Sequence, residues 1–163
     1  MGIQVLEIDG FRSLRSVTWQ PGRLNVVIGP NGSGKSNLLR ALELLRNSAA
    51  GTLPEDVLRE GGIAPLLWDD QVPEIRWHLR AQIEKLTYAY LLEIQRLGKL
   101  SSYRVSQETL EALPGLALLH RDQNRKDFLD RNGARIELGE GVVTEDQPML
   151  AKAFSPFLPP HNR

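Results

Sequence analysis

A glycine-rich loop between an apolar run and an amphipathic helix constrains this chain most. It fits the pattern G-x-x-x-x-G-K-[ST] at every fixed position, and its members are Gly29, Pro30, Asn31, Gly32, Ser33, Gly34, Lys35 and Ser36. Residues 24–28 before it predict a short buried strand, and residues 37–45 after it predict a helix that ends at about residue 47. A strand that passes through glycines into a helix start turns backbone N–H groups inward, and the helix dipole adds about half a positive charge. The pattern therefore predicts a phosphate-binding site.

The side chains of this loop suit a nucleotide with a metal ion. Glycine tolerates positive φ and lets the backbone approach a ligand closely. Lys35 is predicted to reach the β- and γ-phosphates, and the Ser36 hydroxyl is predicted to complete a Mg²⁺ site. Since glycine makes up about 7 % of residues on average, a chance match in a chain of this length is rare.

Composition excludes several other classes of function. The chain has 163 residues, a formal net charge of zero and no cysteine. These values exclude disulfides, thiolate metal sites and cysteine nucleophiles, and they give no overall field for nucleic acid or anionic membranes. The first residues enter a strand pattern at once, and no run approaches the roughly 18 apolar residues of a membrane span. We expect no membrane association and a cytoplasmic location.

The rest of the chain predicts mainly antiparallel strands. The clearest one covers residues 75–83, where apolar and polar residues alternate. The other expected strands cover residues 3–8, 17–19, 87–97, 103–110, 116–119, 128–130 and 134–138, and further helices are expected at 54–59 and 146–154.

The predicted fold class is α/β, with a phosphate-loop strand and helix followed by an antiparallel β-meander. We expect one lobe over residues 1–154, in which 1–47 hold the first strands, the loop and the helix, and 73–138 form the meander. Residues 155–163 form a Pro-rich tail. This order departs from small kinases and GTPases, in which strands and helices keep alternating.

Two segments resemble the opening of RecF/SMC-like ATPases, the ABC-type branch of P-loop NTPases in the bacterial "AAA family ATPase" group. They are residues 8–14, Ile-Asp-Gly-Phe-Arg-Ser-Leu, and residues 21–37, which include the loop. Asn31 and Asn37 are typical of this branch. The resemblance is strong over about residues 3–47 and looser to about 150, and residues 60–62 and 66–68 also look like bacterial members.

The resemblance implies an N-terminal ATP-binding lobe in which two further residues act. Arg12 would lie near the nucleotide phosphates, although it reads equally as a solvated turn residue. Gln147 would help to hold Mg²⁺ and the attacking water, although Asp146 or Gln147 could instead cap the last helix.

Part of the hydrolytic machinery of that family has no clear counterpart here. A Mg²⁺-binding acid at the end of an apolar strand is expected, but Asp69, Asp70 and Asp122 follow runs that suit this poorly. The family places this acid, a catalytic carboxylate and an LSGGQ-like signature in a second half. We therefore expect a lobe that binds ATP but turns over little alone, with a C-terminal ATPase half as partner. The complete protein would form a head-to-head homodimer.

The resemblance implies work in DNA repair, DNA maintenance or phage defence, and DNA is a possible partner by resemblance only. Two alternatives stay open: a non-catalytic interaction module that keeps the nucleotide fold, and a small P-loop kinase or GTPase.

Overall fold

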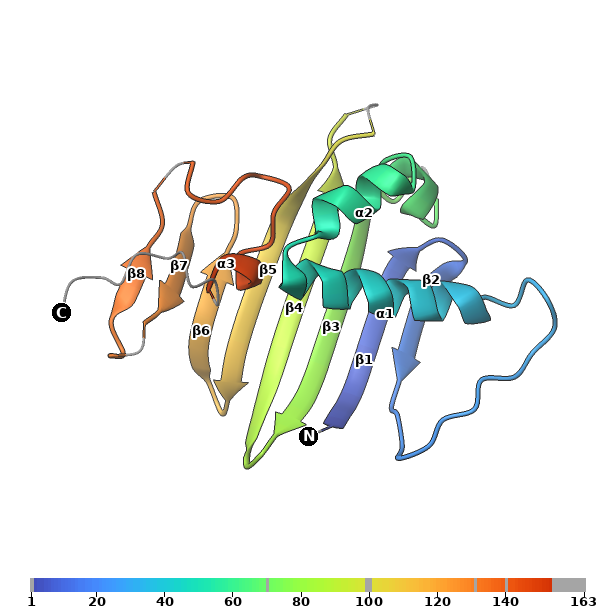
Figure 1. Ribbon diagram of the computed structural model, residues 1–163, viewed down its shortest axis with the longest axis horizontal. Coiled ribbons are helices and arrows are strands. Elements are labelled where there is room, and N and C mark those ends of the chain that lie inside the picture. The colour runs from blue at the N-terminus through green and yellow to red at the C-terminus, as the bar shows by residue number, and fades with distance from the viewer. Residues whose placement is uncertain (1, 70, 99–100, 131, 140, 154–163) are drawn as a thin grey trace.

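The computed structural model describes residues 2–69, 71–98, 101–130, 132–139 and 141–153. Its framework is one eight-stranded sheet in the order β2-β1-β3-β4-β5-β6-β7-β8, in which every neighbouring pair is antiparallel (Figure 1). The strands are β1 (Gly2–Phe11), β2 (Leu14–Trp19), β3 (Glu74–Ile83), β4 (Leu86–Arg96), β5 (Tyr103–Leu113), β6 (Leu116–Arg121), β7 (Lys126–Leu129) and β8 (Arg135–Glu137). The meander predicted from the sequence is therefore confirmed.

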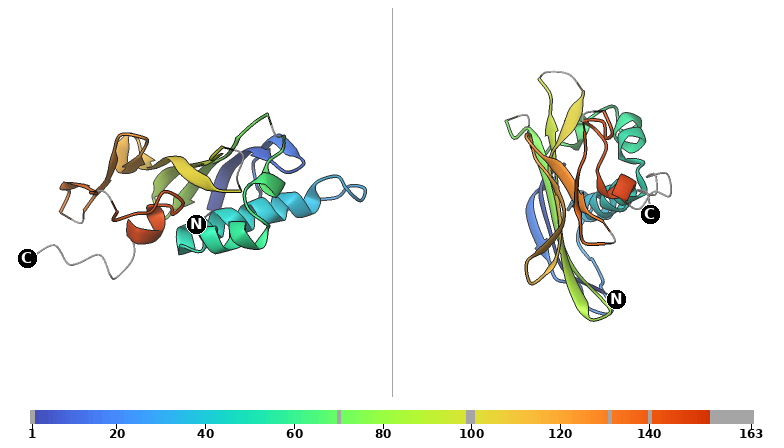
Figure 2. Two further views of the ribbon diagram at one scale, coloured as in Figure 1. Left: turned by 90° about the horizontal axis from the view of Figure 1, so that it is seen from above. Right: turned by 90° about the vertical axis from the view of Figure 1, so that its left-hand side faces the viewer.

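The helices all lie on one face of this sheet, as the edge-on view shows (Figure 2). They are α1 (Lys35–Ala50), α2 (Leu53–Arg59), the short 3-10 turn η1 (Ala64–Leu66) and α3 (Leu150–Ala153). Helix α1 crosses β1, β3 and β4, with α2 beside it and α3 next to its C-terminal end (Figure 1). Among the described helices, none is both long and apolar enough to cross a bilayer.

Alternation along the strands explains why one face carries the core. Ile75 and Trp77 on β3 are fully buried, while Arg76 and His78, which alternate with them, belong to the opposite, more polar face. On α1, Ala41, Leu44 and Leu45 are buried against the sheet. The Trp77 indole N–H donates to the Ala41 carbonyl over 3.1 Å, which joins the sheet to the helix.

The expected buried strand at residues 24–28 is wrong. These residues form an irregular segment between β2 and the phosphate loop, and the side chains of Leu24 and Ile28 are 85 % and 86 % exposed. A strand needs a neighbour for its backbone groups, and in the described part of the chain no strand pairs with this run. Apolar composition shows that a segment can be buried, but it does not supply the partner.

Two smaller expectations also change. The leucines at 38, 39, 42 and 45 do not share one buried face, because Leu39 is 67 % exposed while Leu45 is buried. The last helix begins at Leu150 rather than at residue 146. Residues 154–163, which include the predicted Pro-rich tail, lie outside the described residues.

Candidate phosphate-binding site

The phosphate loop ends where α1 begins, and its backbone leaves donors available. Gly32 and Gly34 have φ of 82° and 93°, a left-handed conformation that glycine adopts without strain. Gly34 is the N-cap residue, and no side chain caps the helix. The first N–H groups of α1 therefore donate no hydrogen bond to a capping side chain. The first turn also carries no acidic residue. This end of α1 therefore suits an anion.

Lys35 folds back over the loop that contains it. Its ammonium Nζ donates to the carbonyl oxygens of Gly29 and Pro30, each over 2.7 Å, and lies 3.5 Å from the Ser33 hydroxyl. A cation is thus held within the loop, beside the N–H groups of the helix start.

The turn between β1 and β2 supports the end of the loop. The Asn37 amide donates to the Ser13 hydroxyl over 2.8 Å. A Cβ atom added at Gly34 would lie 3.0 Å from the Ser13 hydroxyl oxygen and 3.2 Å from a methyl carbon of Leu14. The φ of Gly34 therefore favours glycine, and a side chain there would also require Ser13 and Leu14 to shift by a few tenths of an ångström. Asn37 acts here as a link between the helix and the β1–β2 turn.

Arg12 lies in this same turn, immediately before Ser13. Its φ is 47°, and its backbone N–H donates to the Leu66 carbonyl over 2.9 Å. Its guanidinium forms an ion pair with Glu60 and lies 5.8 Å from the centre of the Phe11 ring. With 29 % of its side chain exposed, Arg12 is a paired residue rather than a freely solvated one.

The structure does not bring Gln147 to the phosphate loop. Gln147 precedes α3, which contacts the C-terminal end of α1: a Cβ atom on Gly51 would lie 3.3 Å from Ala151. The 16 residues of α1 span about 24 Å between that end and the loop. The role of Gln147 at Mg²⁺ stays a prediction from the resemblance, and this arrangement adds no support to it.

The residue that caps α3 is also neither of the two that the sequence suggested. Glu108 on β5, rather than Asp146 or Gln147, accepts the N–H groups of Met149 and Leu150 over 2.5 and 2.9 Å. Its carboxylate also accepts the Tyr90 hydroxyl over 2.9 Å. Burial raises the pKa of Glu108, while these hydrogen bonds and the charge of Arg121 act in the opposite direction.

Arg121 holds the segment before α3 from the other side. Its guanidinium donates to the carbonyls of Gln147, Glu145 and Thr144 over 2.6, 2.9 and 3.3 Å. Its side chain is fully buried, and burial lowers its pKa. Sequence reasoning missed Glu108 and Arg121, because both occur among ordinary alternating strand residues.

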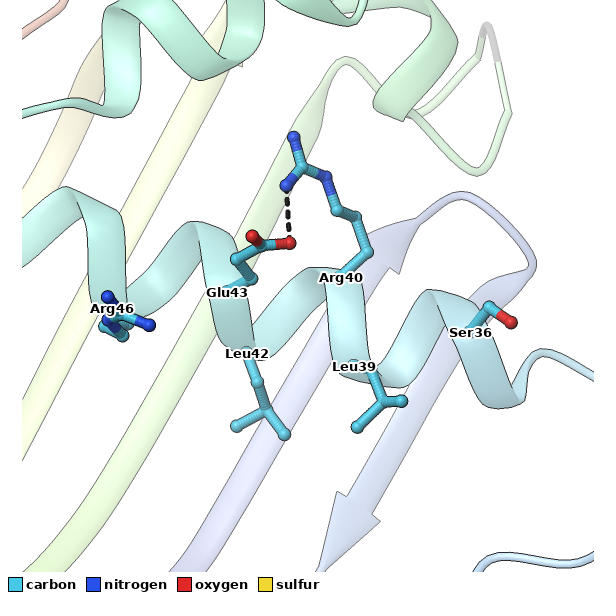
Figure 3. A pocket seen from close by; sticks show the side chains of 6 residues that line it. All are labelled: Ser36, Leu39, Arg40, Leu42, Glu43 and Arg46. Atoms are coloured by element: carbon cyan, nitrogen blue, oxygen red, sulfur yellow. Dashed lines mark hydrogen bonds and ion pairs between the residues drawn. The ribbon is translucent and has the colours of Figure 1, made fainter.

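The predicted metal ligand Ser36 lies in the first turn of α1 and is one of the residues that line an open pocket of about 540 Å³. In Figure 3, Arg40 and Glu43 point to one side of α1, and Leu39 and Leu42 point to the other. Across the described residues, no group of three or more His, Asp or Glu side chains is arranged to hold a metal ion. Asp69 and Asp122 accept N–H groups of their own turns, and Asp70 lies outside the described residues.

The part of the chain that contains the phosphate loop is similar in sequence to known proteins. A family model described as "AAA domain, putative AbiEii toxin, Type IV TA system" matches residues 24–152. The DNA replication and repair protein RecF of Moorella thermoacetica is 45 % identical over 47 residues, which is 28 % of this chain and 12 % of that protein. RecF of Teredinibacter turnerae is 49 % identical over 41 residues, 24 % of this chain and 11 % of its own length.

A longer match is the hemin import ATP-binding protein HmuV of Myxococcus xanthus, 26 % identical over 144 residues. It covers 83 % of this chain and 52 % of the relative. The chain thus spans about half or less of the curated relatives that it matches. Because the family model covers most of the chain and includes the loop and α1, the chain belongs to this AAA domain family, which is of the ABC/RecF-like P-loop type.

Proposed function

We propose that residues 29–36 bind the triphosphate of ATP together with Mg²⁺. The observation that carries this proposal is the Lys35 ammonium, held by two carbonyls of a glycine-rich loop at an uncapped helix start. Backbone N–H groups of residues 32–36 would bind phosphate oxygens, and Lys35 would neutralise the β- and γ-phosphates. The Ser36 hydroxyl would be a ligand of Mg²⁺.

We further propose that the chain is the N-terminal lobe of a larger ATPase and needs a C-terminal half for hydrolysis. The exposed apolar run at 24–28 supports this, because its backbone needs a neighbouring strand and its side chains need a cover. Leu39 on α1 presents a further apolar side chain to solvent. A head-to-head homodimer of the complete protein remains part of this proposal.

The names of the relatives support a shared step rather than one process. RecF is named for DNA replication and repair, HmuV for hemin import, and the family description names a toxin of a TA system. ATP binding is compatible with all three names. From the resemblance to RecF, we propose that the protein acts in DNA repair, DNA maintenance or phage defence. We also propose a cytoplasmic location and DNA as a partner.

Titration calorimetry with ATP and Mg²⁺ tests the binding proposal. The pair of variants is Lys35→Ala and Lys85→Ala, since Lys85 lies in the β3–β4 turn, away from the phosphate loop. Loss of a charged donor to two phosphates predicts a fall in affinity of at least roughly 100-fold for Lys35→Ala, while Lys85→Ala should bind like the unaltered chain. Unchanged affinity in Lys35→Ala would rule out the proposed site.

Two further measurements address the rest of the proposal. Phosphate release by this chain alone should stay at the background rate, and steady turnover would contradict the need for a second half. The Mg²⁺ dependence of ATP affinity in Gln147→Ala tests the role carried over for that residue, and an unchanged dependence would remove it.

A further inference from the structure

Glu60 joins the turn that carries Arg12 to helix α1. One oxygen of its carboxylate pairs with the Arg12 guanidinium, and the other accepts from Arg40 over 2.7 and 2.8 Å. Arg40 is held in turn by Glu43, one turn further along α1, over 2.6 Å. Glu60 itself directly follows α2, and its backbone N–H donates to the Asp56 carbonyl over 3.2 Å. Three separate elements thus meet at one carboxylate.

This carboxylate lies close to the phosphate loop. Arg40 comes five residues after Lys35, a rise of about 7.5 Å along α1. On the other side, Arg12 precedes Ser13, whose hydroxyl is bonded to Asn37 in the first turn of α1. Arg12 and Glu60 are therefore beside the N-terminal half of α1, the end where the phosphates are proposed to bind.

The two arginines that share Glu60 are held differently. Arg40 contacts the carboxylates of Glu43 and Glu60 and lies 4.0 Å from that of Asp56, so it stays compensated if one contact changes. Arg12 contacts Glu60 through a single guanidinium nitrogen, Nη2, and a guanidinium has five N–H donors in a fixed plane. An arginine that is fixed at one nitrogen keeps its other donors for a second anion, and it loses less side-chain freedom when that anion binds.

We propose that Glu60 is a positioning residue for Arg12: it holds the guanidinium beside the phosphate loop, ready to contact the phosphates of ATP. Glu43 serves a separate purpose, because it contacts Arg40 but not Arg12. The inference rests on the proposed ATP site, and it adds a residue whose only link to the nucleotide is through Arg12.

The test compares Glu60→Gln with the matched variant Glu43→Gln, which also removes a carboxylate from Arg40. Affinities for ATP and AMP with Mg²⁺ are measured by calorimetry. Glu60→Gln should weaken ATP binding on the order of tenfold, because a charge-assisted hydrogen bond that orients the arginine is lost. Its AMP affinity should change little, since AMP has no β- and γ-phosphates. Glu43→Gln should bind both nucleotides like the unaltered chain.

A double-mutant cycle separates positioning from a general effect on the fold. In an Arg12→Ala background, Glu60→Gln should have no further effect on ATP affinity. A further loss in that background, or equal losses in Glu60→Gln and Glu43→Gln, would overturn the inference. If Glu60→Gln does not unfold cooperatively, Glu60→Asp replaces it in the same cycle.

The Lys35→Ala variant distinguishes a failure of the proposed ATP site from a failure of the proposed role of Glu60. If Lys35→Ala loses ATP binding while Glu60→Gln keeps it, the site stands and the role of Glu60 fails. If the unaltered chain does not bind ATP, both the site and the role of Glu60 are wrong.

Discussion

Replacing Glu108 by leucine removes a carboxylate that ties α3 to the sheet. The side chain is fully buried and accepts three hydrogen bonds, from the Tyr90 hydroxyl and from the N–H groups of Met149 and Leu150. The leucine would leave these three donors without an acceptor. It would also leave Arg121, whose side chain is 1 % exposed, without a nearby buried negative charge.

The expected loss follows from these contacts. Removing one partner of a buried charged group costs about 3–5 kcal/mol, because the other partner and its hydrogen bonds stay buried. For a chain of this size, each kcal/mol lowers the melting temperature by about 2–4 °C, so Glu108→Leu should melt roughly 6–20 °C lower. Glu108→Gln keeps one acceptor and turns an amide N–H₂ toward a donor, so its loss should be smaller, about 1–3 kcal/mol.

Urea unfolding at pH 7, followed by circular dichroism, measures these free energies. Glu111→Gln is the matched control, because Glu111 lies on the same strand and outside this network. Limited proteolysis between residues 144 and 150 shows whether the loss is local, since the network holds that segment. A loss below about 1 kcal/mol in Glu108→Leu, with the segment still protected, would refute the argument that these contacts stabilise the native state.

Three further perturbations have defined outcomes. Gly34→Ala should weaken ATP binding at least tenfold by calorimetry, since φ is 93° and the new methyl would meet Ser13 at 3.0 Å; unchanged affinity would contradict the loop geometry. Leu44→Ala should cost about 2–5 kcal/mol in urea unfolding, because this fully buried side chain packs in the main core; a cost below about 1 kcal/mol would mean that α1 is not packed as described. Burial raises the pKa of Glu108 above its usual 4.5, so the folded chain binds that proton more tightly than the unfolded chain. The resulting stabilisation is complete below about pH 4 and is lost as pH rises through the pKa of Glu108 in the folded chain. The unfolding free energy of the unaltered chain minus that of Glu108→Gln should therefore fall from pH 4 to pH 7. A rise in this difference would contradict the direction of the pKa shift.

The sheet was largely predictable because its signal is local. Alternation at residues 75–83 corresponds to β3 (Glu74–Ile83), and the Asn-Gly turn at 132–133 separates β7 from β8. The helix after the phosphate loop was also predictable, since the glycines of the loop and the apolar spacing of the helix are both sequence features. In each case the residues that decide the structure are neighbours in the chain.

Features that depend on distant partners were not predictable. The run at 24–28 has a strand composition, but pairing needs a second strand that the described residues do not provide. Glu60 and Arg12 are 48 residues apart, and no periodicity relates them. Glu108 caps a helix 41 and 42 residues later in the sequence, so its role appears only when β5 and α3 are seen together.

A structure determined with Mg²⁺ and a non-hydrolysable ATP analogue would show whether residues 29–36 bind the triphosphate. The proposed site predicts that the backbone of residues 32–36 binds the β- and γ-phosphates, with the Lys35 ammonium moved from the carbonyls of Gly29 and Pro30 onto phosphate oxygens. A loop without nucleotide at saturating analogue, or Lys35 still bonded to those carbonyls beside a nucleotide bound elsewhere, would contradict it.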